Sequence, residues 1–155
     1  MTKNKIEPKI FAIDFDGTSV GFGFPLVGPD IGAAEVMRDM VAAGHRIILH
    51  TMRSDKENLT SDNVDILCPK AGDDANYLSQ AVMWFKENDI PLFGVNINPE
   101  QYSWTDSPKP YADYYIDDIA IGCPTMVDPK ISSRPFVDWI MIRSFLEASN
   151  LINLK

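Results

Sequence analysis

Cysteine is scarce in this chain, and long apolar runs are missing from it. The two cysteines, Cys68 and Cys123, lie far apart and form no Cys-x-x-Cys pair. This spacing favours free thiols in a reducing compartment over a disulfide framework or a metal site. No stretch reaches the roughly 18 apolar residues of a membrane span, and strand-like residues follow the N-terminus instead of a signal core. We therefore expect a cytoplasmic protein without a membrane anchor.

Positive charge is also in short supply. The chain has 14 Lys and Arg against 22 Asp and Glu, which gives a formal net charge of −8. Because nucleic-acid binding needs clustered Lys and Arg, this balance argues against nucleic acid as a bulk electrostatic partner. Hydrophobic residues nevertheless make up 45% of the chain, as in ordinary globular proteins. With no repeat and no low-complexity segment, residues 1–155 are expected to form a single domain.

Short apolar segments alternate with helical patterns along the chain. Strands are predicted over residues 10–13, 46–51, 92–96 and 114–116. Helices are predicted over 31–43 and 74–88, with Asp30 and Asp74 as their N-caps, and from Pro135 through Leu146. Residues 120–127 give a weaker signal for an edge strand. The order predicts an α/β fold, a Rossmann-like three-layer sandwich with a central, mainly parallel sheet.

Three segments between these elements are predicted to be loops. Residues 20–29 directly follow the first strand and form either a small flap or an ordinary turn with packed aromatics. Residues 54–73 and 98–110 are long connections, and such loops are often functional. Their aromatic residues are candidates for stacking a ring, although packing is the commoner role; they are Phe22, Phe24, Tyr102 and Trp104.

Polar residues follow the predicted strands at the ends where α/β sheets bind ligands. Asp14 and Asp16 come directly after the first strand. The later candidates, in chain order, are Thr51, Lys109 and the pair Asp117-Asp118. Each residue alone has a structural explanation, since an aspartate at a strand end often caps a turn. Their joint order predicts a shared site.

Carboxylates that converge in one crevice repel each other unless a cation neutralises them. Oxygen ligands favour a hard cation, and Mg²⁺ accepts carboxylates together with water and a phosphate. We therefore expect Mg²⁺ as cofactor. A phosphoryl group can then approach Asp14, while Lys109 adds positive charge in the transition state. Thr51 and the backbone N–H groups of residues 15–18 are expected to hydrogen-bond its oxygens.

Asp16 is expected to act on protons and not on phosphorus. It can protonate the departing alkoxide and then deprotonate the water that hydrolyses an aspartyl-phosphate on Asp14. Arg53 lies two residues beyond Thr51, where either a substrate anion or a surface salt bridge would engage it. His45 and His50 have no matching partner, and we interpret both as structural.

The motifs resemble those of the haloacid dehalogenase (HAD) superfamily over residues 9–122. Asp14-Phe15-Asp16-Gly17-Thr18 resembles its first motif, and Thr51 at the end of an apolar strand resembles its second. Lys109 in Ser107-Pro108-Lys109-Pro110 and the sequence Tyr115-Ile116-Asp117-Asp118 resemble the third and fourth. The resemblance implies a HAD-like hydrolase that transfers phosphoryl groups with Mg²⁺.

The resemblance also implies a role for each matching residue. Asp14 would be nucleophile and metal ligand, and Asp16 the acid/base with its backbone carbonyl on the metal. Asp117 would bind the metal directly, and Asp118 directly or through water. Phosphoryl binding would fall to Gly17, Thr18, Thr51, Met52, Arg53 and Lys109. The second aspartate of the first motif points to phosphatase and not to dehalogenase chemistry.

Only about a dozen residues separate Thr18 from the Asp30 helix, too few for a cap domain. The resemblance is therefore to a capless or minimally capped member, whose open site suits larger substrates or closure by a second copy in a homo-oligomer. We predict a Mg²⁺-dependent phosphatase that acts through an aspartyl-phosphate on Asp14. Its phosphorylated substrate is not identified by the sequence, and a nucleotide or a nucleic-acid end is a narrower option.

Two alternatives from other classes stay open. One is a non-catalytic scaffold that has kept the Mg²⁺ and phosphate site. The other is a receiver-like phosphoacceptor, but there the acidic pair precedes the acceptor aspartate, whereas Asp117-Asp118 follows Asp14.

Overall fold

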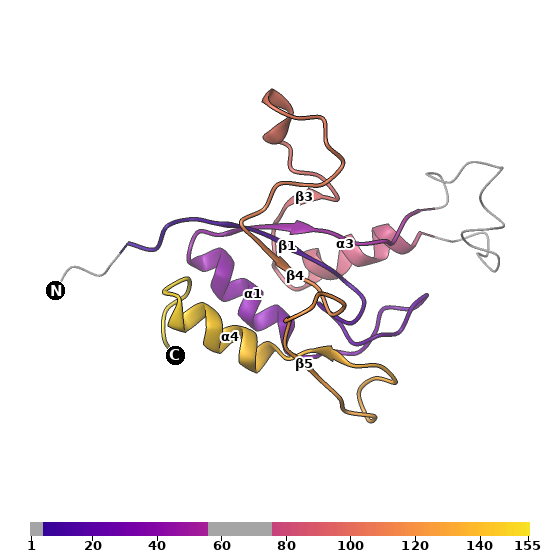
Figure 1. Cartoon of the computed structure of the whole chain (residues 1–155). Helices are drawn as coiled ribbons and strands as arrows, with labels where there is room; N and C mark the ends of the chain where they lie inside the picture. Colours follow the sequence, from indigo (N-terminus) through magenta and orange to yellow (C-terminus); the bar gives the residue numbers. More distant parts are fainter. Residues whose placement is uncertain (1–4, 56–75) are drawn as a thin grey trace.

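The structure is a computed structural model that describes residues 5–55 and 76–155 (Figure 1). The first half contains β1 (Ile10–Ile13), α1 (Ala33–Ala42) and β2 (Arg46–Leu49). From residue 76 onward the structure contains α3 (Tyr77–Glu87), β3 (Leu92–Val95), the short 3-10 helix η2 (Gln101–Ser103) and β4 (Tyr114–Ile116). The chain then forms β5 (Thr125–Met126), β6 (Phe136–Val137) and α4 (Trp139–Ala148).

Four parallel strands form the central sheet in the order β3-β2-β1-β4. Strand β1 lies inside the sheet, and Ile13 is paired with Leu49 of β2 and with Ile116 of β4. All four residues of β1 are buried, as expected for an apolar strand covered on both faces. The predicted α/β fold with a parallel sheet is therefore confirmed. The order also places the chain segment after β1 between the ends of β2 and β4.

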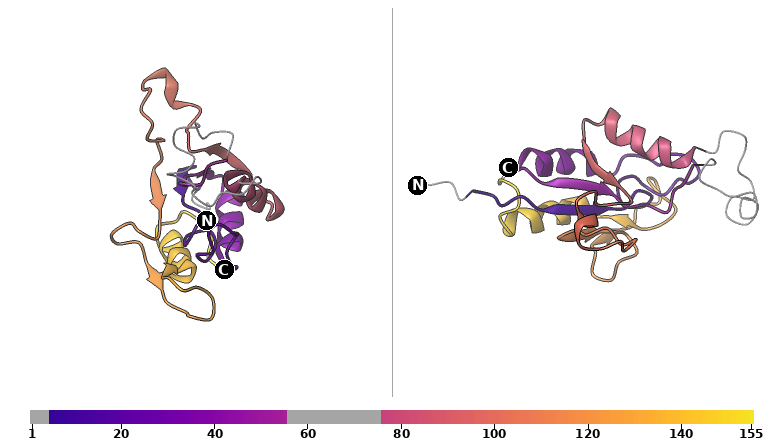
Figure 2. Two further views of the ribbon diagram at one scale, coloured as in Figure 1. Left: turned by 90° about the vertical axis from the view of Figure 1, so that its right-hand side faces the viewer. Right: turned by 90° about the horizontal axis from the view of Figure 1, so that it is seen from above.

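The helices pack on one face of this sheet. Phe11, Ile13 and Leu49 belong to a single buried cluster with residues of α1, α3 and α4. The steps from β1 to β2 and from β2 to β3 run in one direction, so right-handed crossovers place α1 and α3 on the same face. Helix α4 returns beside α1 (Figures 1 and 2).

The connection from β3 to β4 crosses on the side of the other face. It runs back past β1, so its crossover lies opposite to α1 and α3. There the Tyr115 hydroxyl donates a hydrogen bond to the Pro110 carbonyl. The part of this connection that contains η2 projects away from the sheet (Figure 1). Within residues 5–55 and 76–155, no α-helix therefore forms the second outer layer of the expected sandwich.

Several predicted boundaries differ because a different residue caps the element. Helix α1 begins after Gly32, whose φ is 82°, and Asp30 Oδ1 accepts from the Gly32 N–H in a turn before the helix. Helix α4 begins after Asp138, which accepts from two N–H groups of the first turn. The predicted N-cap Asp74 and most of the predicted loop 54–73 lie outside the described residues.

The remaining differences are in the last third of the chain. The predicted edge strand over 120–127 is reduced to β5, which pairs antiparallel with β6 in a separate two-stranded sheet.

His45 has the structural role we expected, because it is buried and its Nδ1 accepts from the Lys9 N–H at 3.0 Å. None of the described helices has the length and apolar character needed to cross a membrane.

The C-terminal elements hold the loop that follows β1. The Trp139 indole donates to the Thr18 carbonyl at 2.6 Å, and the Val137 N–H donates to the Gly17 carbonyl at 2.9 Å. Trp139 is 3% exposed, so water does not reach the Thr18 carbonyl in place of the indole donor. Residues more than 110 positions apart therefore share one local structure at the end of the sheet.

We expect Trp139→Phe to lower the free energy of unfolding by about 1–3 kcal/mol, because it leaves the buried Thr18 carbonyl without its indole donor. Urea unfolding measures the change. The neighbouring substitution Ile140→Ala, at a side chain that is 78% exposed, serves as control and should change stability by less than about 0.5 kcal/mol. Equal stability of Trp139→Phe and wild type would contradict this role.

Candidate active site

Three carboxylates meet at the carboxyl end of the central strand. Asp14, Asp117 and Asp118 each offer an oxygen, and these oxygens lie within 4.8 Å of one another. The parallel register explains the meeting: Ile13 pairs with Ile116, and the Asp14 N–H donates to the Ile116 carbonyl at 3.0 Å. The residues that follow these two strands are therefore neighbours in space.

The buried Thr18 hydroxyl lies between two of the carboxylates. Its hydroxyl lies 3.2 Å from Asp14 Oδ2 and 3.4 Å from Asp118 Oδ1, and it accepts from the Asp118 N–H at 3.0 Å. The hydroxyl has one proton, so it can donate to only one of the two carboxylates at a time. Thr18 therefore positions the acidic residues.

Gly17 is required by the same close approach. Its φ is +82°, and a Cβ at this position would lie 2.5 Å from Asp118 Oδ2. Its N–H donates to the Val20 carbonyl, and the Thr18 N–H donates to the Phe15 carbonyl. The expectation that these two N–H groups bind a phosphoryl group is therefore wrong, because both are used inside the turn and neither residue lines the cavity described below.

Burial and neighbouring negative charge raise the proton affinity of Asp14 and Asp118. Burial raises the pKa of Asp14 to about 7, and the charges of Asp117 and Asp118 add to the effect. Burial, and then the charge of Asp117, also raises the pKa of Asp118. Within residues 5–55 and 76–155, no Lys or Arg pairs with any of the three. An all-oxygen donor set with unbalanced negative charge fits a hard divalent cation such as Mg²⁺.

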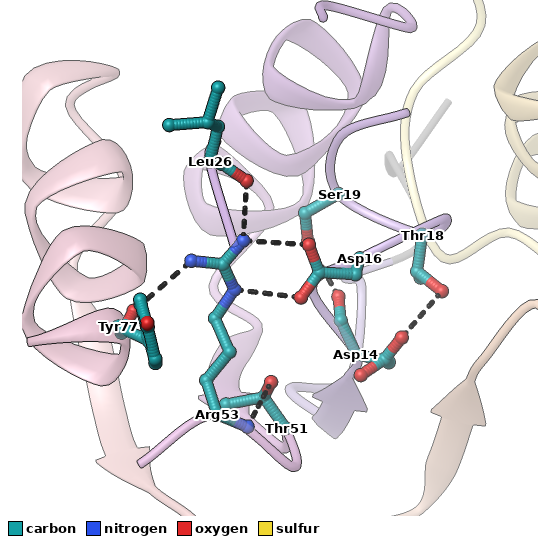
Figure 3. A network of polar contacts seen from close by, with 8 residues as sticks. All are labelled: Asp14, Asp16, Thr18, Ser19, Leu26, Thr51, Arg53 and Tyr77. Atoms are coloured by element: carbon teal, nitrogen blue, oxygen red, sulfur yellow. Dashed lines mark hydrogen bonds and ion pairs between the residues drawn. The ribbon is translucent and has the colours of Figure 1, made fainter. Parts of the chain in front are cut away.

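Asp16 lies apart from this cluster and is paired with Arg53 (Figure 3). Nε and a terminal nitrogen of Arg53 donate to the two carboxylate oxygens, each at 2.7 Å. The Arg53 side chain is 1% exposed and also donates to the carbonyls of Leu26, at 2.8 Å, and Tyr77, at 3.3 Å. Its guanidinium lies 4.9 Å from the centre of the Phe15 ring.

Of the two alternatives for Arg53, the structure shows the salt bridge, which it forms with Asp16, but the pair is buried and not at the surface. Arg53 also lines the cavity described below, so a contact with a substrate anion stays a prediction. This buried arginine ties Asp16 to the 20–29 loop and to α3. The side chain of Asp16 does not belong to the cluster of Asp14, Asp117 and Asp118. Its backbone carbonyl as a metal ligand stays a prediction.

A cavity of about 390 Å³ opens above these residues. The residues that line it are Asp14, Asp16, Phe22, Phe24, His50, Thr51, Met52, Arg53, Asp117, Asp118, Ile119 and Arg134. The Thr51 hydroxyl accepts from the Arg53 N–H at 3.1 Å, and no acceptor for its own proton lies in the described part of the chain, so this proton can reach a ligand. Met52 is 97% exposed and lies at the rim. The 20–29 loop contributes Phe22 and Phe24 to the wall.

Lys109 does not line the cavity, contrary to expectation. Its ammonium lies 5.4 Å from the centre of the Tyr115 ring, and this ring in turn packs against His50. The Gln101 side-chain amide donates to the Lys109 carbonyl at 3.2 Å. The rings of Tyr115 and His50 therefore lie between the Lys109 ammonium and the cavity.

No pattern in the sequence indicated Arg134 or Ile119 as site residues, and His50, which we interpreted as structural, lines the cavity. In sequence, Arg134 lies outside all four motifs. Tyr102 and Trp104, two of the aromatic candidates, are exposed near η2 and do not contribute to the wall. A basic residue that reaches a site only through folding of a distant loop has no local pattern that would reveal it.

A solved structure described as a conserved protein from Bacteroides thetaiotaomicron is similar to this chain. It is 23% identical, the TM-score is 0.64, and the similarity covers 92% of this chain and 93% of that one. At this identity the likeness supports the fold alone. Neither the models of protein families nor the curated proteins give a match to the sequence.

The raised pKa of Asp14 predicts a pH effect on stability. The folded pKa of about 7 lies above the unfolded value near 3.8, so folding favours the protonated form. In metal-free buffer this residue's contribution should fall as the pH rises from about 4 through 7, by up to about 4 kcal/mol. Urea unfolding should show Asp14→Asn gaining stability over wild type as the pH rises.

The matched control is Asp106→Asn, which removes the same charge from an exposed position. Its stability should follow that of wild type at every pH. A constant difference between Asp14→Asn and wild type from pH 4.5 to 8 would contradict the burial of Asp14 beside two other carboxylates.

Proposed function

We propose that this protein is a Mg²⁺-dependent phosphatase of the HAD type, with Asp14 as nucleophile. The observation that carries the proposal is the convergence of Asp14, Asp117 and Asp118 within 4.8 Å at the end of β1, inside a cavity. Asp14, Asp117 and Asp118 would hold the Mg²⁺, which when bound neutralises the carboxylates and the phosphoryl group. Carboxylates alone would repel such a substrate.

Asp14 would attack phosphorus through a carboxylate oxygen. A bond forms between this oxygen and phosphorus, the bond from phosphorus to the leaving oxygen breaks, and the alkoxide takes a proton. Water then attacks the aspartyl-phosphate, phosphate leaves, and Asp14 is regenerated. The Thr51 hydroxyl lines the same cavity and would donate to a phosphoryl oxygen. Since Lys109 lies outside the cavity, no lysine is assigned to the reaction.

Asp16 would move the protons in both steps. In the structure both of its oxygens accept from Arg53, and in this arrangement it can take a proton from water. To protonate a leaving group it must first carry a proton and give up part of the pairing with Arg53. Arg53 therefore acts as a positioning residue that orients Asp16 and holds it apart from the carboxylate cluster.

We expect hydrolysis of phosphomonoesters to require Mg²⁺ and to be lost in Asp14→Asn, because the amide cannot attack phosphorus. Mg²⁺ should also raise the thermal midpoint of wild type and not that of Asp14→Asn. Phosphate release over a panel of nucleotides, sugar phosphates and phosphorylated nucleic-acid ends measures activity, with Asp106→Asn as control. Turnover in Asp14→Asn would exclude Asp14 as nucleophile. Mg²⁺ binding without turnover of any compound would favour the scaffold alternative.

We expect Arg53→Lys to lower kcat at least tenfold and to leave KM within about twofold, because lysine keeps the charge but cannot hold both oxygens of Asp16. Asp16→Asn should lower kcat strongly by itself. Adding Arg53→Lys to Asp16→Asn should then cost little further activity, since both changes act on one residue. Steady-state kinetics of the four proteins decide the point; a rise in KM as the main effect of Arg53→Lys would instead indicate a substrate contact.

A further inference from the structure

The cavity has more room than a phosphoryl group fills. At about 390 Å³ it falls within the range of sites that enclose small molecules, roughly 300–1,000 Å³. Its lining includes the acidic residues and Thr51, to which the proposed chemistry is assigned. Three further lining residues, Phe22, Ile119 and Arg134, play no part in the chemistry derived above.

The cavity is lined by four carboxylates and two guanidiniums, and the two guanidiniums differ in kind. Arg53 is buried and committed to Asp16. Arg134 is exposed, and its guanidinium lies 3.9 Å from the centre of the Phe22 ring. Among residues 5–55 and 76–155, no carboxylate pairs with Arg134. Of these two, Arg134 is therefore the cation available to a ligand.

A buried hydroxyl holds Arg134 and Phe22 together. Ser132 is 5% exposed, and its Oγ accepts from the Phe22 N–H and from the Arg134 N–H, each at 3.2 Å. One side-chain atom thus anchors two segments that lie 110 residues apart in the chain. The backbone N–H groups of Phe22 and Arg134 both donate to this buried oxygen. The Phe22 ring and the Arg134 guanidinium therefore form a structured part of the cavity wall.

We propose that Arg134 and Phe22 form the leaving-group subsite, and that the preferred substrate is a phosphomonoester whose leaving group carries a second anion, a carboxylate or a second phosphate. A charge-assisted hydrogen bond from a guanidinium suits either group. The acidic residues would repel a second anion, so it lies at the Arg134 side of the cavity, away from Asp14. This inference rests on the proposed phosphatase function and assigns the substrate class of the same site.

The test compares three compounds that share one ring: phenyl phosphate, 4-carboxyphenyl phosphate and 1,4-phenylene bisphosphate. With Mg²⁺, wild type should hydrolyse at least one of the two compounds with a second anion with at least tenfold higher kcat/KM than phenyl phosphate. Arg134→Gln should remove this preference through KM and leave phenyl phosphate within about twofold. Lys130→Gln is the control and should behave as wild type, because Lys130 is an exposed cation four residues before Arg134 that does not line the cavity.

The preference between carboxylate and second phosphate identifies the source of the anion. Equal kcat/KM for all three compounds in wild type, or an equal loss for all three in Arg134→Gln, would overturn the subsite. If wild type hydrolyses none of them, the phosphatase proposal is decided by the wider panel above, and calorimetric binding with Mg²⁺ tests the subsite separately. At least tenfold weaker binding of the better anionic compound to Arg134→Gln would support it, and unchanged binding would overturn it.

Discussion

Repulsion among Asp14, Asp117 and Asp118 is the constraint on which the rest of the site depends. The parallel pairing of Ile13 with Ile116 forces the carboxylates together, and the buried Thr18 hydroxyl satisfies only part of their hydrogen-bonding capacity. The sheet, the turn after β1 and the C-terminal segment must supply the stability that this cluster takes away. Such a local conflict, supported by a consistent fold elsewhere, is typical of functional sites.

Two aspartates only two residues apart have different surroundings. Asp14 faces the acidic residues after β4, whereas Asp16 faces the arginine after β2. In the described part of the chain no basic side chain pairs with Asp14, whereas Asp16 has a buried guanidinium on both oxygens. Environments that separate paired carboxylates in this way give them separate chemical roles. The position of β1 between β2 and β4 is what makes the separation possible.

Local patterns predicted the parts of the structure that depend on short stretches of chain. The four apolar segments became the four strands of the sheet, and the meeting of Asp14 with Asp117 and Asp118 followed from parallel pairing. Lys109 was misplaced because its position depends on how a long crossover packs on the far face, through contacts such as the Gln101 amide. The phosphate-binding role of the Gly17 and Thr18 N–H groups was wrong because the turn uses these donors itself.

The sequence by itself determined the α/β class, the central strand and the acidic residues at its end. Hydrophobic periodicity and the order of elements along the chain can both be read from short stretches of sequence. Only the tertiary structure decided the partners of those residues. Arg53 became buried against Asp16, and Ser132 brought Arg134 beside Phe22 across 110 residues. Contacts of this kind depend on side-chain packing between distant segments, and the pattern of either segment alone does not contain them.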